Sequence, residues 1–414
     1  MAITFMMNEA TKQFALAHAD DDVRQLALKG CRDAEVDMTV ALQQISGRQA
    51  ARSKIPSWAA IDNICYPVHL SMEQCSSEAT ARYKAQLVAP GSLSSPGYRK
   101  LVDLTGGFGV DFAFMAENFD EGIYVERNES LCAIVYHNLQ VLADSSINPN
   151  AVSVVNAEAE TFLHNMEEHV TLIFVDPARR DSRGARAFGI SDCTPDVLPL
   201  MDELLKKADR VLLKLSPMLD WRKAVADVGS EHVEQVHIVA VGGECKELLL
   251  LLSAEGSPQP QLVCSNDGRQ ESFCLSGKTN PAKPVEPIQP LQPLFLYEPH
   301  AALMKAGLFS ELAQRYGVVP LAPNSHLFTA DAPIDDFPGR AFRVTDVSTM
   351  NRQELKEKVL PLRQANITVR NFPMSAEALR KKLKLNEGGD HYLFATTLAD
   401  DRRVLLLCEK IALK

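Results

Sequence analysis

The stretch Leu101-Val-Asp-Leu-Thr-Gly-Gly-Phe-Gly-Val-Asp111 decides the fold of this chain. Its apolar residues predict a buried strand that ends at Asp103, and its glycines predict a turn that leads into a helix near Val110. In α/β proteins, a strand followed by a glycine-rich turn and a helix binds nucleotide cofactors at the carboxyl edge of a parallel sheet. Glycines in that turn let the backbone approach the ligand and present amide groups to it.

The segments around this stretch alternate in the same way. Short apolar runs are separated by helical stretches of about a dozen residues, a rhythm that predicts βαβ units on a parallel sheet. Two further runs joined by Gly242-Gly-Glu-Cys245 are expected to form an antiparallel hairpin. In chain order the runs are Leu101–Leu104, Gly122–Val125, Val152–Val155, Leu172–Val175, Val211–Leu215, Val236–Val241 and Leu248–Leu252.

Carboxylates distinguish the glycine turn from a phosphate-binding loop. Asp103 and Asp111 flank the turn, and Phe112 stands where a third glycine would follow Gly107 and Gly109. Carboxylates repel a pyrophosphate group but suit a ligand that carries a cationic amine. The turn therefore favours S-adenosylmethionine over NAD, and an NAD-dependent oxidoreductase is the less favoured alternative.

Acidic residues also follow the next predicted strands. Glu126 ends the second strand, 23 positions after Asp103, where a carboxylate can bind the two ribose hydroxyls. Glu158 follows the third strand and is either an adenine contact or an acid that caps a surface helix. Asp176 precedes Pro177 at the end of the fourth strand, where it faces the acceptor site or makes structural hydrogen bonds.

On these residues, the segment 88–255 resembles the class I S-adenosylmethionine-dependent methyltransferases. The resemblance implies a Rossmann-like α/β fold and S-adenosylmethionine as the cofactor. The chain departs from the family pattern at Thr105, which stands at the first glycine position, and at Asp176-Pro-Ala-Arg179. The latter replaces the Asn/Asp-Pro-Pro-aromatic motif of amino-group methylases, so it argues against an amino group as the acceptor.

The resemblance implies a set of site residues and no metal site. Asp176 is the candidate catalytic residue, because it would orient the acceptor or take its proton. For Arg179 and Arg180, the alternative to binding substrate is a position in a solvated loop. For Lys214, the alternative is a structural role as a buried lysine paired with an acid. The cofactor-binding candidates are Asp103, Thr105, Gly107, Phe108, Gly109, Glu126, Arg127, Glu158 and Asp176, and the substrate-binding candidates are Pro177, Arg179, Arg180 and Lys214.

Strings in the last third of the chain narrow the resemblance. Examples are Tyr297-Glu-Pro-His-Ala-Ala-Leu-Met-Lys-Ala-Gly307, Pro323-Asn-Ser-His-Leu-Phe-Thr329 and Leu379-Arg-Lys-Lys-Leu-Lys-Leu385. Together with Asp176-Pro-Ala-Arg-Arg180 they resemble bacterial methyltransferase-like proteins with a carboxy-terminal THUMP-like domain and a small ferredoxin-like segment. This resemblance covers nearly the whole chain and implies a methyltransferase that acts on RNA, either tRNA or rRNA.

The chain of 414 residues is expected to contain four segments. Residues 1–87 form a helical domain, since they are rich in Ala, Leu, Gln and Arg and show no strand alternation. Residues 88–278 form the methyltransferase domain, and 279–340 form a Pro-rich linker with the ferredoxin-like segment. Residues 341–414 form a THUMP-like α+β domain with the element order β-α-β-α-β-β.

The charge of the chain is uneven. A net charge of −10 excludes an overall basic coat, but residues 341–414 hold 14 basic and 9 acidic side chains. In a predicted helix at 376–384, Ala376, Leu379 and Leu383 share one face while the basic residues project elsewhere. This helix is expected either to contact RNA or to be a solvated face. A catalytically silent RNA-binding protein on a methyltransferase scaffold is therefore the other alternative.

Composition also bears on location. The longest apolar run, Leu248–Leu252, is too short to span a bilayer, and residues 1–22 lack the features of a signal peptide. Nine scattered cysteines without a CxxC pair are typical of a reducing cytoplasm. We therefore expect a cytoplasmic protein without a membrane segment, and the sequence leaves its oligomeric state open.

Overall fold

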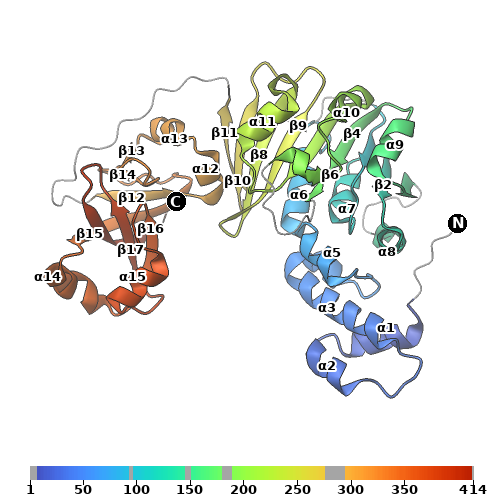
Figure 1. The fold of residues 1–414 in the computed structure, drawn as a ribbon, viewed down its shortest axis with the longest axis horizontal. Coiled ribbons are helices and arrows are strands. Elements are labelled where there is room, and N and C mark those ends of the chain that lie inside the picture. The colour runs from blue at the N-terminus through green and yellow to red at the C-terminus, as the bar shows by residue number, and fades with distance from the viewer. Residues whose placement is uncertain (1–6, 93–96, 145–150, 180–188, 276–293, 413–414) are drawn as a thin grey trace. The chain divides into compact units, whose positions relative to one another are not determined.

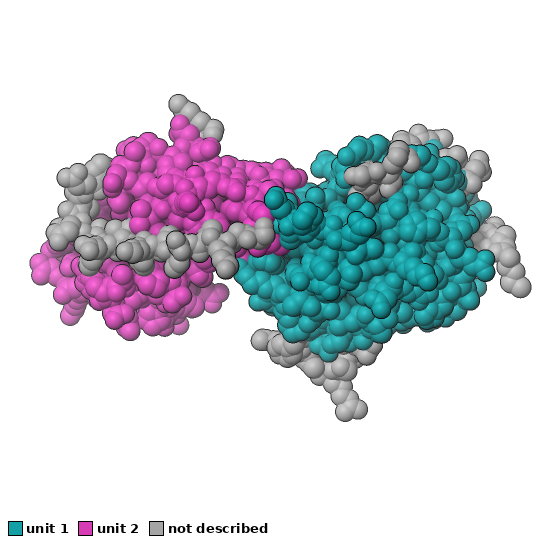
Figure 2. Space-filling model, turned by 90° about the horizontal axis from the view of Figure 1, so that it is seen from above, with its two compact units in different colours: residues 1–241, 246–261 teal, residues 242–245, 262–414 magenta. Residues whose placement is uncertain are grey.

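The computed structural model describes residues 7–92, 97–144, 151–179, 189–275 and 294–412. They form two compact units, shown in different colours in Figure 2. The first unit contains residues 1–241 and 246–261, and the second contains residues 242–245 and 262–414.

The first unit begins with six helices, as the composition of residues 1–87 predicts (Figure 1). Asn8, Asp22, Asp37 and Ser77 cap four of them, because each side chain accepts a hydrogen bond from a backbone N–H of the first turn. The helices are α1 (Glu9–Ala17), α2 (Val23–Lys29), α3 (Met38–Lys54), α4 (Pro56–Ala59), α5 (His69–Gln74) and α6 (Glu78–Leu87).

Seven strands of the first unit are hydrogen-bonded in the order β8-β9-β7-β4-β1-β2-β3. Strands β7, β4, β1, β2 and β3 are each parallel to their neighbours in this order, and β9 is antiparallel to β7. This arrangement confirms the predicted α/β sheet. The chain order reverses between β1 and β4, so a crevice is expected at their carboxyl ends. The strands are β1 (Lys100–Asp103), β2 (Glu121–Glu126), β3 (Val152–Asn156), β4 (Val170–Val175), β7 (Ala208–Leu215), β8 (Val233–Val241) and β9 (Glu244–Leu252).

Two of the helices between the strands share one apolar core with the amino-terminal helices. Tyr124 and Phe174 of the sheet and Phe112 of the helix after β1 are buried in the same cluster as Trp58. The ring of Trp58 meets Phe108, in the glycine turn, edge to face at 5.3 Å. The helical region is thus packed directly behind the turn. The remaining helices are α7 (Val110–Ala116), α8 (Glu129–Val141), α9 (Ala159–Asn165), α10 (Met201–Lys207) and α11 (Trp221–Val228), and β5 (Ala178–Arg179) pairs with β6 (Cys193–Thr194).

The second unit is built on a seven-stranded sheet with the order β13-β14-β12-β15-β18-β17-β16. One face carries Phe342, Phe394 and Leu406, and the other packs Leu393 against Leu379 of α15. The strands are β12 (Phe295–Pro299), β13 (Val319–Pro320), β14 (Phe328–Ala330), β15 (Gly339–Thr349), β16 (Asn366–Arg370), β17 (His391–Thr397) and β18 (Arg403–Ile411). The helices are α12 (Ala301–Ala306), α13 (Phe309–Tyr316), α14 (Arg352–Glu354) and α15 (Ala376–Leu383), and β10 (Gln261–Asn266) neighbours β11 (Arg269–Cys274) across a tight turn.

The predicted order β-α-β-α-β-β is confirmed over residues 339–411. The first helical segment differs from a regular helix, because α14 continues as a π-helical turn at Leu355–Val359. Antiparallel pairing of β12 with β15, with Leu296 opposite Phe342, joins the ferredoxin-like segment and the α+β segment in one sheet. None of the helices in the described part of the chain is both long and apolar enough to cross a membrane.

Candidate active site

The glycine turn between β1 and α7 is held by close packing. A Cβ atom on Gly106 would lie 2.0 Å from the ring of Tyr124, so no other residue fits there without a shift. Gly109 begins α7 with φ of 76°, a left-handed conformation that favours glycine. Thr105, which departs from the family pattern, accepts a hydrogen bond at its Oγ1 from the Asp176 N–H at 2.6 Å. This threonine therefore ties the carboxyl ends of β1 and β4 together.

A cavity of about 810 Å³ lies at the carboxyl ends of the parallel strands. It is lined by the glycine turn, by the residues that follow β2, β3, β4 and β7, and by α5 with the loop after it. The structure thus brings eleven of the thirteen predicted site residues to one cavity. They are Asp103, Thr105, Gly107, Phe108, Gly109, Glu126, Arg127, Glu158, Asp176, Pro177 and Lys214.

The two remaining candidates are arginines. The backbone of Arg179 lies in β5, where it pairs with Cys193, and its side chain lies outside the described part of the structure. Arg180 lies outside the described residues.

Asp103 is a buried carboxylate inside this cavity. It is 1% exposed, and its Oδ1 accepts a hydrogen bond from the Thr105 N–H at 2.9 Å. Burial, together with the neighbouring carboxylates, raises the pKa of Asp103 well above its ordinary value. Within the described ranges, no lysine, arginine or histidine forms an ion pair with it. A ligand ammonium group would supply the missing charge, so this position fits the amino acid end of S-adenosylmethionine.

Glu126 and Glu158 also fit a nucleoside. The Glu126 carboxylate accepts hydrogen bonds from the N–H groups of Gly107 at 3.0 Å and Asn128 at 2.8 Å, which fix its orientation beside the glycine turn. Its remaining lone pairs can accept from ribose hydroxyls. Glu158 occupies the N-cap position of α9, yet its side chain makes no capping bond. Its exposed carboxylate is therefore available at the cavity.

Asp176 and Lys214 form an ion pair on the acceptor side of the cavity. Lys214 Nζ donates to Asp176 Oδ2 at 2.6 Å and lies 3.2 Å from Asp111 Oδ2. Burial opposes a charge on Lys214, but the carboxylates of Asp176 and Asp111 outweigh it and raise the pKa of Lys214 well above its ordinary value. Burial raises the pKa of Asp176, and Lys214 limits that rise. Lys214 thus both lines the cavity and pairs with acids.

Three residues that bear on the site were missed from the sequence. Ser76 lines the cavity and accepts a hydrogen bond from Lys214 Nζ at 2.9 Å, while Lys84 and Glu247 form a buried ion pair behind it. The signal for Lys84 was its place on the apolar face of α6, since Thr80 and Ala81, one turn earlier, are buried. The signal for Glu247 was its position directly before the apolar run Leu248–Leu252.

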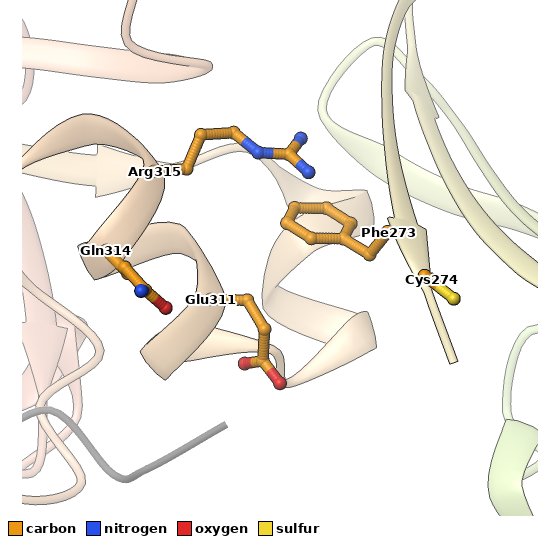
Figure 3. Close-up of a pocket in the computed structure, with 5 residues that line it drawn as sticks. All are labelled: Phe273, Cys274, Glu311, Gln314 and Arg315. Carbon is orange, nitrogen blue, oxygen red and sulfur yellow. The ribbon is translucent and has the colours of Figure 1, made fainter. Parts of the chain in front are cut away.

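A smaller cavity of about 350 Å³ lies in the second unit (Figure 3). The guanidinium group of Arg315 already has partners in this cavity. Its Cζ lies 4.1 Å from the centroid of the Phe273 ring, and its Nη1 forms an ion pair with Glu271 Oε2 at 3.1 Å. This cavity contains none of the predicted site residues. Its lining residues are Phe273, Cys274, Glu311, Gln314 and Arg315.

Comparison with known proteins agrees with this geometry. Residues 339–410 match the family described as THUMP domain-like, and residues 295–338 match a ferredoxin-like domain. No curated protein matches the sequence. A crystal structure of a candidate methyltransferase from Porphyromonas gingivalis W83 is 32% identical, with a TM-score of 0.82, over 98% of this chain and 100% of that chain.

A more distant structure matches only part of the chain. It is SMU.1697c, a candidate methyltransferase from Streptococcus mutans in complex with S-adenosylhomocysteine, which is 12% identical with a TM-score of 0.30. That match covers 42% of this chain and 95% of the other. The relationship rests on the Porphyromonas gingivalis protein, which aligns over its whole length. The chain belongs to its family, the class I S-adenosylmethionine-dependent methyltransferases with a carboxy-terminal THUMP-like domain.

Proposed function

We propose that this protein transfers the methyl group of S-adenosylmethionine to a nucleophile on RNA, either tRNA or rRNA. The observation that carries the proposal is one cavity at the glycine turn in which Asp103, Glu126 and the Asp176–Lys214 pair meet. Among the described residues, the buried Asp103 has no ion-pair partner, and backbone hydrogen bonds orient Glu126. The enzyme acts chiefly by bringing donor and acceptor together in the correct orientation.

The cofactor side of the cavity consists of the glycine turn and two acids. Asp103 would hold the ammonium group, and Glu126 would accept hydrogen bonds from the ribose hydroxyls. A Cβ atom on Gly107 would meet only the Thr105 carbonyl oxygen, at 3.9 Å among the described residues, so the Gly107 backbone can lie directly against the ligand. When bound, S-adenosylmethionine supplies a methyl group activated by its sulfonium charge. The six carboxylates that line the cavity suit that positive charge and would repel the pyrophosphate of NAD.

The acceptor side consists of Asp176, Pro177 and Lys214. The Asp176 side chain is 36% exposed, so it can reach a group inside the cavity while Lys214 fixes its orientation. Asp176 would orient the acceptor nucleophile and accept its proton. A raised pKa makes its carboxylate a stronger base than an ordinary aspartate.

The carboxy-terminal domain would hold the RNA. Ser375 caps α15, and Leu379 and Leu383 anchor it to the sheet, which leaves the side chains of Lys381, Lys382 and Lys384 exposed. Arg380 instead lies near Glu387 at 3.3 Å. Among the described residues these three lysines form no ion pair, and exposed lysines of this kind can contact backbone phosphates.

Mass spectrometry of RNA nucleosides tests this proposal. RNA from a strain that lacks the protein is compared with RNA from its parent, and one methylated nucleoside is expected to be missing and to return when the purified enzyme and S-adenosylmethionine are added. An Asp176→Asn enzyme should not restore it. Identical nucleoside profiles, together with RNA binding by the purified protein, would instead favour a catalytically silent RNA-binding protein. We also propose a cytoplasmic location, which fits a role on RNA and nine scattered cysteines without a CxxC pair.

A further inference from the structure

A buried cluster of charges lies behind the acceptor side of the cavity. Its members come from the helical region, from α7, from β7 and β9, and from the residue that follows β4, so segments far apart in the sequence meet here. We call this group the charge cluster. It consists of Ser76, Lys84, Asp111, Asp176, Lys214 and Glu247.

Lys214 is the link between the cluster and the cavity. Its ammonium group donates to Asp176 at 2.6 Å, to Ser76 at 2.9 Å and to Asp111 at 3.2 Å. Three acceptors match the three N–H groups of a lysine ammonium. Lys214 therefore has a fixed direction, and the carboxylate of Asp176 is fixed with it.

Lys84 and Glu247 hold the far side of the cluster. Lys84 is fully buried, pairs with Glu247 and lies 3.1 Å from Asp111 Oδ1. Burial would raise the pKa of Asp111, but the ammonium groups of Lys84 and Lys214 lower it. Neither Lys84 nor Glu247 lines the cavity. These two residues therefore act on the site through the electric field of their charges and through their contacts with Asp111 and Ser76.

We propose that Lys84 and Glu247 are positioning residues that hold the Lys214–Asp176 pair and set the charge that Asp176 carries inside the cavity. Only the role of Asp176 toward the acceptor rests on the proposed function. The arrangement makes the helical region part of the active site, because α6 supplies Lys84 and the loop before α6 supplies Ser76.

The signs of the charges predict opposite effects for the two residues. Burial raises the pKa of Asp176, Lys214 lowers it, and the charges of Asp111 and Glu247 raise it further. Neutralising Glu247 should therefore lower the pKa of Asp176. Removing Lys84 should raise it, because the negative charges of Glu247 and Asp111 are then less compensated. Among the described residues, the charged or titratable groups that face Asp176 or line the same cavity are Cys75, Lys84, Asp103, Asp111, Glu126, Arg127, Glu158, Glu160, Lys214, Lys246 and Glu247.

The test is a direct titration of Asp176 in the cofactor-free protein. The protein is labelled with ¹³Cγ-aspartate, and the Asp176 carboxyl resonance is identified by its absence in Asp176→Asn. We expect the midpoint of this resonance to move by about one pH unit to lower pH in Glu247→Gln and by a similar amount to higher pH in Lys84→Met. A merely structural role would shift neither midpoint, or would shift both in the same direction.

Glu247→Gln preserves the shape of the side chain and keeps the proposal falsifiable if Lys84→Met does not fold. An unchanged Asp176 midpoint in Glu247→Gln overturns the proposal. The titration needs no substrate, so it is independent of methyl transfer. Where the wild type methylates RNA, the acid limb of its pH–rate profile should move in the same direction as the carboxyl titration. If the wild type transfers no methyl group, the proposed function fails while the titration still decides the positioning role.

Discussion

The ion pair between Lys84 and Glu247 allows a quantitative test of what holds the charge cluster together. The cluster contains two ammonium groups and three carboxylates, so its net charge is −1. Lys84→Met leaves the cluster with a net charge of −2, and the Glu247 side chain within it is only 4% exposed. Removing one partner of a buried ion pair costs about 3–5 kcal/mol, because the other charge remains unpaired. Lys84→Met is therefore expected to lower the free energy of unfolding of the first unit by this amount.

The double variant Lys84→Met/Glu247→Gln restores the net charge of −1. It should recover about 2–3 kcal/mol relative to Lys84→Met, since the uncompensated carboxylate is gone. Lys223 provides the matched control: it pairs with Asp227 at 2.6 Å, but its side chain is 57% exposed. Lys223→Met should cost about 0.5 kcal/mol or less.

Urea unfolding followed by tryptophan fluorescence measures these differences. Both tryptophans, Trp58 and Trp221, lie in the first unit, so the signal reports the unfolding of that unit. The midpoint of Lys84→Met should fall by about 1 M or more. The reasoning is refuted if Lys84→Met unfolds at the same urea concentration as Lys223→Met, or if the double variant is no more stable than Lys84→Met.

Three further predictions concern acid sensitivity, the glycine turn and RNA. Burial lowers the pKa of His237 to about 4, so the contribution of His237 to stability is present above pH 6.5 and is lost as the pH falls toward 4. Between pH 7 and pH 5, the free energy of unfolding in urea should therefore fall by about 2 kcal/mol more for the wild type than for His237→Asn. Equal losses in the two proteins would contradict this prediction. Gly107→Ala should lower the free energy of unfolding by about 1–2 kcal/mol, because Gly107 has a φ of +55°. It should also weaken S-adenosylhomocysteine binding at least tenfold in calorimetry, because the added methyl group would project into the cavity. An unchanged affinity would place the ligand elsewhere. Replacing the exposed lysines at α15 (Lys381, Lys382 and Lys384) by Gln should reduce the slope of log K against log[salt] for RNA binding by about 2, whereas the control Lys223→Gln should leave it unchanged. An unchanged slope in the triple variant would exclude phosphate contacts at this helix.

The parallel sheet was predictable because its signals are local. Each predicted strand lies within a strand of the structure or within one residue of its end, since buried parallel strands are uninterrupted apolar runs. By contrast, β12 was missed: it is five residues long, ends in Pro299 and follows a Pro-rich segment. Its strand conformation depends on pairing with β15, which lies more than forty residues further along the chain.

The site was predictable where the chain itself defines the geometry. Asp103, Glu126 and Asp176 end adjacent parallel strands, so the topology alone brings them to one edge. The charge cluster could not be predicted in this way. Lys84 and Glu247 are separated by 163 positions, and no local pattern shows that a buried lysine and a buried glutamate will meet. Thr105 was predicted as a cofactor-binding residue and as a departure from the family pattern, but its hydrogen bond with the Asp176 N–H was not, because that bond joins the ends of two different strands.

The central claim is that the cavity at the glycine turn binds S-adenosylmethionine through its acids. Calorimetry of the purified protein with S-adenosylhomocysteine tests it most directly, with Glu126→Ala as the variant and Glu117→Ala, on the segment after α7, as the matched control. The wild type and Glu117→Ala are predicted to bind one ligand per chain with equal affinity. Glu126→Ala is predicted to lose at least tenfold in affinity, because the ribose hydroxyls lose an oriented acceptor. No binding by the wild type, or equal binding by Glu126→Ala, would contradict the claim.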